Sequence, residues 1–146
     1  MSFHFFSKEK LKNAQVFSAD FFSNAVLIND GKMNFAAKAL PWEAQLSSYR
    51  DAVIVNANND QLPDILLVGN YYDNNIQMGR YDADFGTVLI NKDGGNFTCE
   101  SINGLQIKGQ VRHIRKIQLA DGKEAYVLAR NNDSTMVIKF EDSKQK

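Results

Sequence analysis

Two aspartates, Asp82 and Asp84, are the residues whose type and spacing could most directly support catalysis. Two carboxyl groups on either side of a glycosidic bond can serve as a general acid and as a nucleophile or base. Aspartates in a polar loop more often cap turns or face the solvent. We favour this second interpretation. A glycoside hydrolase or lyase, completed by residues outside this chain, remains the alternative.

The other side chains suited to catalysis are few and isolated. The chain has one cysteine, Cys99, and two histidines, His4 and His113. Neither histidine has the spacing of a nucleophilic or metal centre, and a single cysteine excludes an intrachain disulfide. Cys99 and His113 are expected to be structural residues on strands. We therefore predict that the protein is not an enzyme.

The long polar segment 70–85 has the composition of a recognition surface. It reads NYYDNNIQMGRYDADF. Tyrosine and arginine provide much of the binding energy at interfaces, and long loops in compact folds are commonly functional. The alternative is that its arginine and aspartates pair with neighbours and only hold the loop. The predicted contacts to a protein or glycan ligand are Tyr71, Tyr72, Arg80, Tyr81 and Asp82.

These residues must be positioned by a repeated unit, because one segment of the chain occurs twice. VLINDGKMNF (26–35) returns as VLINKDGGNF (88–97), so the offset in sequence position is 88 − 26 = 62. We call this the repeat offset. It also aligns 50–55 with 112–117 and 65–70 with 127–132. Recurrence at a fixed period is typical of repeat folds.

The strand pattern agrees with this repeat. Apolar and β-branched runs between Asn, Asp and Gly turns predict about ten strands, the first at 3–6, with helical turns over 7–14. We predict an all-β fold of four-stranded antiparallel β-propeller-type blades, as a fragment or partial propeller. A β-sandwich is the competing architecture, but it does not explain the constant offset. The blades expected in this single repeat domain, 1–146, are partial over 1–48, complete over 49–103 and partial over 110–141.

Composition narrows the classes of partner. Seventeen basic and seventeen acidic residues leave no net charge, so the electrostatic signature of a nucleic-acid binder is missing. The start MSFHFF lacks the features of a signal peptide, and no segment reaches the roughly 18 apolar residues of a membrane span. Two incomplete blades leave strand edges unpaired. The expected partners are therefore the remaining blades of a larger propeller or another copy of the chain.

Several segments resemble the FG-GAP/VCBS repeat proteins, which are β-propellers related in architecture to the integrin α-chain head. The resemblance spans about residues 16–132 and rests on NANNDQLPDILLVGN (56–70), WEAQ (42–45), GRYD (79–82) and LINDGKMNF (27–35). It is closest to the C-terminal blades of large proteins of this type. It implies an extracellular or cell-surface location and a role in adhesion or ligand binding.

The same resemblance implies a calcium loop between the first two strands of a blade. Carried over by position, its ligands are the side chains of Asn56, Asn58, Asp60 and Asp64 and the carbonyl of Leu62. Two amides stand where the family has carboxylates, so calcium binding is expected to be weak and structural. A metal-free turn held by Asx hydrogen bonds is an equally weighted alternative.

Overall fold

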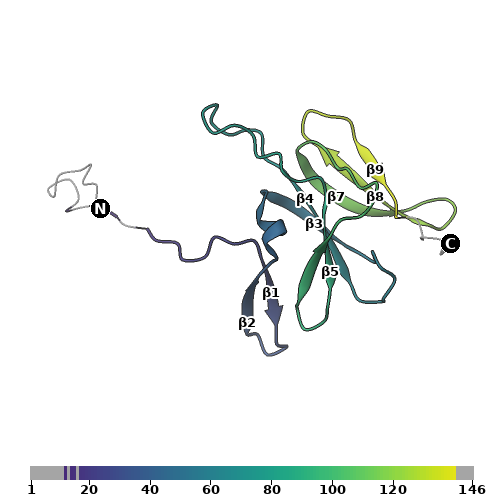
Figure 1. The fold of residues 1–146 in the computed structure, drawn as a ribbon, viewed down its shortest axis with the longest axis horizontal. Coiled ribbons are helices and arrows are strands. Elements are labelled where there is room, and N and C mark those ends of the chain that lie inside the picture. Colours follow the sequence, from purple (N-terminus) through teal and green to yellow (C-terminus); the bar gives the residue numbers. More distant parts are fainter. Residues whose placement is uncertain (1–11, 13, 16, 141–146) are drawn as a thin grey trace.

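The computed structural model describes residues 12, 14–15 and 17–140 of the chain, and this part is all-β. Its nine strands form three antiparallel sheets, joined in chain order and fanned out side by side (Figure 1). The only helical element in these residues is a 3₁₀ turn, η1 (Trp42–Gln45). No helix in the described part is long and apolar enough to cross a membrane. The strand expected at 3–6 and nearly all of 7–14 lie outside the described residues.

The strands fall within the three ranges of the predicted blades. The first sheet is the hairpin β1 (Ala25–Asn29) and β2 (Phe35–Ala39). The second sheet contains, in this order, β3 (Tyr49–Val55), β4 (Asp64–Gly69), β5 (Thr87–Asn91) and β6 (Phe97–Glu100). The third contains β7 (Val111–Gln118), β8 (Glu124–Arg130) and β9 (Met136–Ile138). The all-β, antiparallel prediction is confirmed, and the sheets do not close into a ring.

The two copies of the ten-residue segment form the same hairpin. Leu27 pairs with Ala37 in the first copy, and Leu89 pairs with Cys99 in the second. Four consecutive pairs of β1–β2 recur in β5–β6 at the repeat offset. In both turns, the residue after the first strand donates its N–H to the carbonyl of the residue before the second strand. The repeat is therefore structural as well as sequential.

The pairing of the first two strands in the second sheet, β3 and β4, differs by one residue from that of β7 and β8 in the third sheet. The register shifts just after Tyr49 in β3 and, at the equivalent position, just after Val111 in β7. Val55 then pairs with Asp64, whereas its equivalent Ile117 pairs with Ala125, so the offset in the second strand is smaller by one. The turn between β7 and β8 is therefore one residue shorter than the turn between β3 and β4. The expected alignment of 65–70 with 127–132 is therefore wrong by one residue.

The second sheet is covered on its trailing face and, over β4 and β5, on its leading face. We call the face turned toward the preceding sheet its leading face and the opposite one its trailing face. Leu67 and Leu89 on the leading face pack with Ala44 of η1. The trailing face packs on the leading face of the third sheet, and this core contains Val55, Leu66, Val68, Val88, Ile90, Val111, Ile114, Tyr126 and Leu128. β4 is buried on both sides, in agreement with its nearly continuous apolar sequence.

The connections between sheets contribute to the same interfaces. Leu40 and Ala44, between β2 and β3, pack in the first interface. Ile102, Leu105 and Ile107, between β6 and β7, pack in the second. The second interface thus consists of a trailing face, a connecting segment and the leading face of the next sheet, whereas the first consists of the connecting segment and the leading face of the second sheet.

Candidate functional site

Residues 70–85 form a narrow arm that extends away from the sheets (Figure 1). At its base, Tyr71 and Tyr81 form an isolated antiparallel bridge, and each N–H donates to the other carbonyl at 2.9 Å. Near its tip, the N–H of Met78 donates to the carbonyl of Asn75 at 2.8 Å. Backbone pairing rather than a packed core therefore holds the arm.

The predicted ligand residues line this arm and contact one another. The Arg80 guanidinium lies 5.0 Å from the ring centroid of Tyr72, and Arg50 lies 5.2 Å from that of Tyr71. The Tyr72 hydroxyl donates to Asp82 at 2.5 Å. Burial and this hydrogen bond raise the pKa of Tyr72 to about 12. Its hydroxyl therefore stays protonated at neutral pH.

The tip of the arm carries two apolar side chains that the sequence analysis missed. Ile76 is 98% exposed, and Met78 is also exposed. The local sequence does not reveal their exposure, because whether an apolar residue in a polar loop is exposed depends on where the loop lies in the folded protein. The base of the arm is fixed to β7, since Arg112 and Asp73 form an ion pair at 2.9 Å.

Asp84 is buried below the arm and has structural partners. Its carboxylate accepts hydrogen bonds from the N–H of Gly69 at 3.1 Å, the N–H of Gly86 at 3.0 Å and the hydroxyl of Thr87 at 3.0 Å. Burial raises the pKa of this carboxyl. Asp82 belongs instead to the exposed side of the arm. The two carboxylates thus have separate roles, which favours the turn-holding interpretation.

Asn70 joins the arm to two connecting segments and was also missed. Its Oδ1 accepts from the Ser47 hydroxyl at 2.8 Å and from the N–H of Asp84 at 3.0 Å. Its Nδ2 donates to the carbonyls of Asp84 at 2.8 Å and Gly109 at 3.1 Å. The side chain is buried and the backbone φ is 75°. Asparagine tolerates this left-handed conformation better than most residues, so both its backbone and its side chain suit this position.

The predicted calcium loop, 56–64, is held by hydrogen bonds within the protein. Asp64 is fully buried, and its two oxygens accept from the N–H groups of Ala57 at 2.8 Å and Asn91 at 2.9 Å. This carboxylate therefore ties the loop to the neighbouring β5–β6 turn. In the third sheet its position is taken by Ala125, so that tie is lost there.

The remaining predicted ligands form an Asx turn. Asp60 accepts from the N–H of Leu62 at 2.9 Å and from the amide of Asn58 at 2.7 Å, while Asn56 is exposed. Within the described residues, no group of three or more His, Cys, Asp or Glu side chains could hold a metal ion. A cation bound here would have to compete with these hydrogen bonds.

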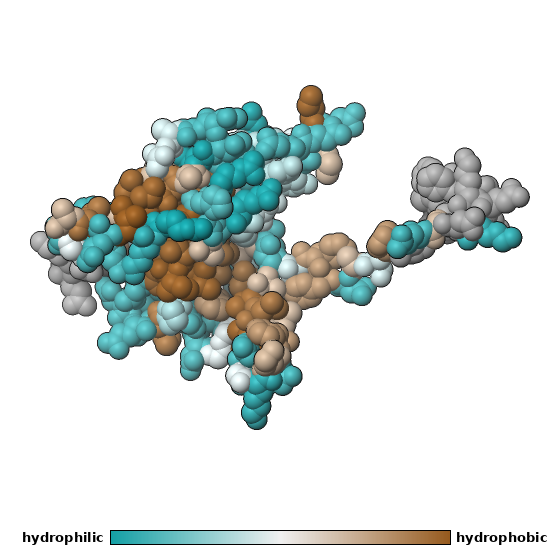
Figure 2. All heavy atoms as spheres, turned by 180° about the vertical axis from the view of Figure 1, so that it is seen from behind, coloured by the Kyte–Doolittle hydropathy of each residue, from teal (hydrophilic) through white to brown (hydrophobic). Residues whose placement is uncertain are grey.

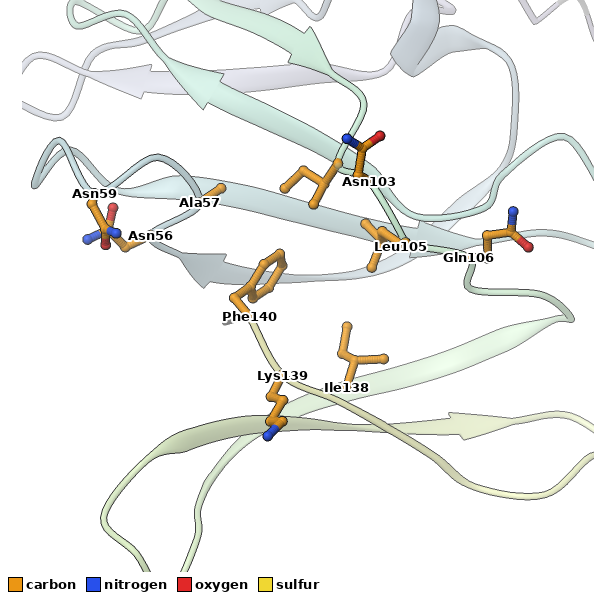
Figure 3. A pocket seen from close by; sticks show the side chains of 11 residues that line it. Asn56, Ala57, Asn59, Asn103, Leu105, Gln106, Ile138, Lys139 and Phe140 are labelled. Carbon is orange, nitrogen blue, oxygen red and sulfur yellow. The ribbon is translucent and has the colours of Figure 1, made fainter. Parts of the chain in front are cut away.

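A cleft of about 630 Å³ opens beside this loop, between the second and third sheets. Phe140 and Ile138 project into it from the end of the third sheet, and Leu105 faces them from the connecting segment (Figure 3). Carboxamides stand around these apolar side chains: Asn56, Asn59, Asn103 and Gln106. Sequence reasoning missed the cleft because three segments far apart in the chain form its walls.

The contact between β3 and β7 contains the predicted structural histidine. His113 is exposed, with its Nδ1 3.4 Å from Asp51. Asp51 also accepts from the N–H of Ile114 at 3.0 Å and from Arg115 at 2.6 Å. Partial burial raises the pKa of Asp51, but these hydrogen bonds outweigh it and the net pKa is lowered. Cys99 is half-buried on β6, and burial raises the pKa of its thiol.

Comparison with known proteins identifies no relative of this chain. No family model, curated protein or solved structure matches it. Its function must therefore be inferred from the arm, the buried polar residues beneath it and the relation between the sheets.

Proposed function

We propose that this chain is a non-catalytic, FG-GAP/VCBS-type propeller module of an exported or surface protein, and that the arm binds a protein or glycan ligand. The observation that carries this proposal is the exposed tip of the arm. Ile76 is 98% exposed on a segment whose base is fixed by Asn70 and Asp73. Keeping an isoleucine in water forgoes the roughly 1.5–3 kcal/mol that its burial would contribute, which favours a role in contact with a partner.

A protein ligand suits the arm better than a glycan. The Arg80–Tyr72 stack could contact either class, since aromatic and guanidinium planes pack on sugar rings and on protein side chains. The aliphatic tip, however, fits an apolar pocket on a protein surface, where such side chains become binding hot spots. Glycan binding through the tyrosines alone is the second outcome of the test below.

The propeller-type architecture is supported by the way in which the sheets repeat. The connecting segment before the second sheet and the one before the third each pack on the leading face of the sheet that follows, and the hairpin register recurs at the repeat offset. Radial repetition of four-stranded sheets is how propellers build a core.

We propose at most a weak, structural calcium site at Asn56, Asn58, Asp60, Leu62 and Asp64. The loop satisfies its own polar groups, and two carboxylates supply little charge for an ion that takes six to eight oxygen ligands.

A binding screen with arm variants tests the proposed function. The immobilised chain is exposed to purified matrix proteins such as fibronectin, fibrinogen and collagen, and to a panel of polysaccharides. Saturable binding that Ile76→Ser and Arg80→Ala each weaken at least about tenfold is expected, since hot-spot residues contribute about 1–2 kcal/mol or more. Met33→Ser, at an exposed methionine in the β1–β2 turn, is the matched control and should bind normally.

The enzymatic alternative is decided on the same polysaccharide panel. Release of reducing sugar that Asp82→Asn or Asp84→Asn abolishes would overturn the non-catalytic proposal. Binding unaffected by both arm variants would overturn the assignment of the arm.

A further inference from the structure

The first sheet exposes an apolar face whose equivalents are buried elsewhere in the same chain. Leu27 is 64% exposed and Phe35 is 61% exposed. Their equivalents at the repeat offset, Leu89 and Phe97, pack in a cluster with Leu40 and Ala44 of the segment that connects the first and second sheets. Alternation along the strands gives the leading face of the hairpin these apolar residues: Ala25, Leu27, Phe35, Ala37 and Ala39.

Asn29 also lies on this face, but its side chain accepts a hydrogen bond from the N–H of Gly31 in the turn. Apolar side chains gather over the hairpin and the extended segment that leads into it (Figure 2). Phe21 and Phe22, immediately before β1, are exposed as well. A hairpin alone is marginally stable in water, so an uncovered apolar face leaves this one with little support on that side.

The third sheet has the opposite face partly uncovered. Val137 is 59% exposed, whereas Val88, which takes the same place in the second sheet, is fully buried. The two positions correspond because Leu66 pairs with Val88 and its equivalent Val127 pairs with Val137. The small and aliphatic residues of this trailing face that keep some exposure are Ile117, Val127, Ala129 and Val137, whereas Ala125 on the same face is buried.

The described residues therefore contain one complete trailing-to-leading interface, between the second and third sheets, and one exposed apolar face of each kind, on the first and third sheets. We propose that the trailing face of β7–β9 in one copy docks on the leading face of β1–β2 in a second copy, so that chains associate head to tail. Such a heterologous contact closes into a ring if the rotation per chain allows it and otherwise forms an open array. This inference does not depend on the arm or on its ligand.

The composition of the trailing face sets the strength of this contact. Arg115 occupies the position that Val53 has in the second sheet. A charged side chain at this position reduces the apolar area, and the first sheet contributes only two strands to the contact. We expect association that depends on protein concentration rather than a permanent oligomer.

Two complementary variants test the direction of assembly. Leu27→Asp places a charge on the leading face, and Val137→Asp places one on the trailing face. Sedimentation velocity from micromolar to submillimolar concentration should show the native chain associating and each variant remaining monomeric. An equimolar mixture of the two variants should form a 1:1 dimer and nothing larger, because only one intact junction is available. Ile76→Asp at the arm tip should associate like the native chain.

Each other outcome overturns the proposal. A native chain that stays monomeric removes it. Association of Val137→Asp alone would mean that two leading faces meet each other, and association of Ile76→Asp weaker than native would mean that the arm mediates assembly. Circular dichroism confirms folding, and Ala37→Glu replaces Leu27→Asp should that variant unfold.

Discussion

Asp84 and Asp51 are two carboxyl groups whose pKa values move in opposite directions, and their substitutions should therefore respond oppositely to pH. Burial raises the pKa of Asp84, and hydrogen bonds from Ile114, Ala52 and Arg115 outweigh burial to lower that of Asp51. The raised pKa of Asp84 means that its carboxyl group binds a proton more tightly in the folded state than in the unfolded state. The contribution of Asp84 to folding stability therefore falls as pH rises above the unfolded pKa of about 3.9. The contribution of Asp51 is fully present above that pH and is lost as pH falls through its lowered pKa in the folded state.

Asp84→Asn should destabilise the fold by about 1–3 kcal/mol at pH 7, because one amide oxygen cannot accept all three hydrogen bonds. Between pH 3 and pH 7 this deficit should narrow as pH rises, because only the native carboxyl is penalised on ionising. Asp51→Asn is the control with the opposite pH dependence: its loss of folding stability relative to the native chain should grow as pH rises. Urea unfolding at several pH values measures both, and a deficit for Asp84→Asn that grows with pH would contradict the assignment.

Calcium should bind the 56–64 loop with a dissociation constant on the order of 10⁻⁴ to 10⁻³ M, as in weak extracellular modules. Calorimetry should show that Asp60→Ala removes this binding. Asp121→Ala is the matched control, because Asp121 also accepts an Asx hydrogen bond, from the N–H of Lys123 at 3.0 Å, but lies in the turn of the third sheet. The absence of heat and of any change in melting temperature at millimolar calcium would remove the site.

At the scale of the elements, close backbone approach at Gly69 fixes the start of the second sheet. A Cβ added to Gly69 would lie 2.1 Å from the carbonyl oxygen of Ser48. Because that neighbour is backbone and cannot rotate away, Gly69→Ala should cost about 3 kcal/mol or more. Gly31→Ala, which meets no atom within 4 Å, should cost only about 1 kcal/mol for its φ of 79°. Thermal or chemical unfolding of both variants checks this difference, and equal costs would contradict it.

The strands and turns also differ in how well the sequence alone predicts them. The hairpins β1–β2 and β5–β6 were predictable because their apolar residues and Gly-containing turns recur at one offset. The shorter turn before β8 was not, since a deletion among exposed polar residues leaves no mark in the hydrophobic pattern. The arm was found by composition, whereas its tip, the buried Asn70 and the cleft depend on contacts between distant segments. Such contacts arise only once the sheets have packed together.

At the scale of the whole molecule, the three sheets should differ in local stability. The second sheet is covered on its trailing face and, over β4 and β5, on its leading face, whereas every residue of β2 in the first sheet is exposed. Hydrogen exchange should therefore be slowest in β4 and β5 and much faster in β1 and β2, which can open without disrupting the larger core. Protection of β1 and β2 should increase with protein concentration as copies associate. Equal protection of all three sheets in dilute solution would contradict this view.

The constant spacing of the hairpins has a consequence for how such a chain can grow. Because the trailing face of the second sheet packs on the leading face of the third, a tandem duplication of the segment 49–110 would insert a new sheet between two compatible neighbours. No existing contact would need redesign, and the ends of the molecule would stay unchanged. The chain can therefore lengthen by one repeat unit at a time, through duplication of a unit whose core contacts already exist.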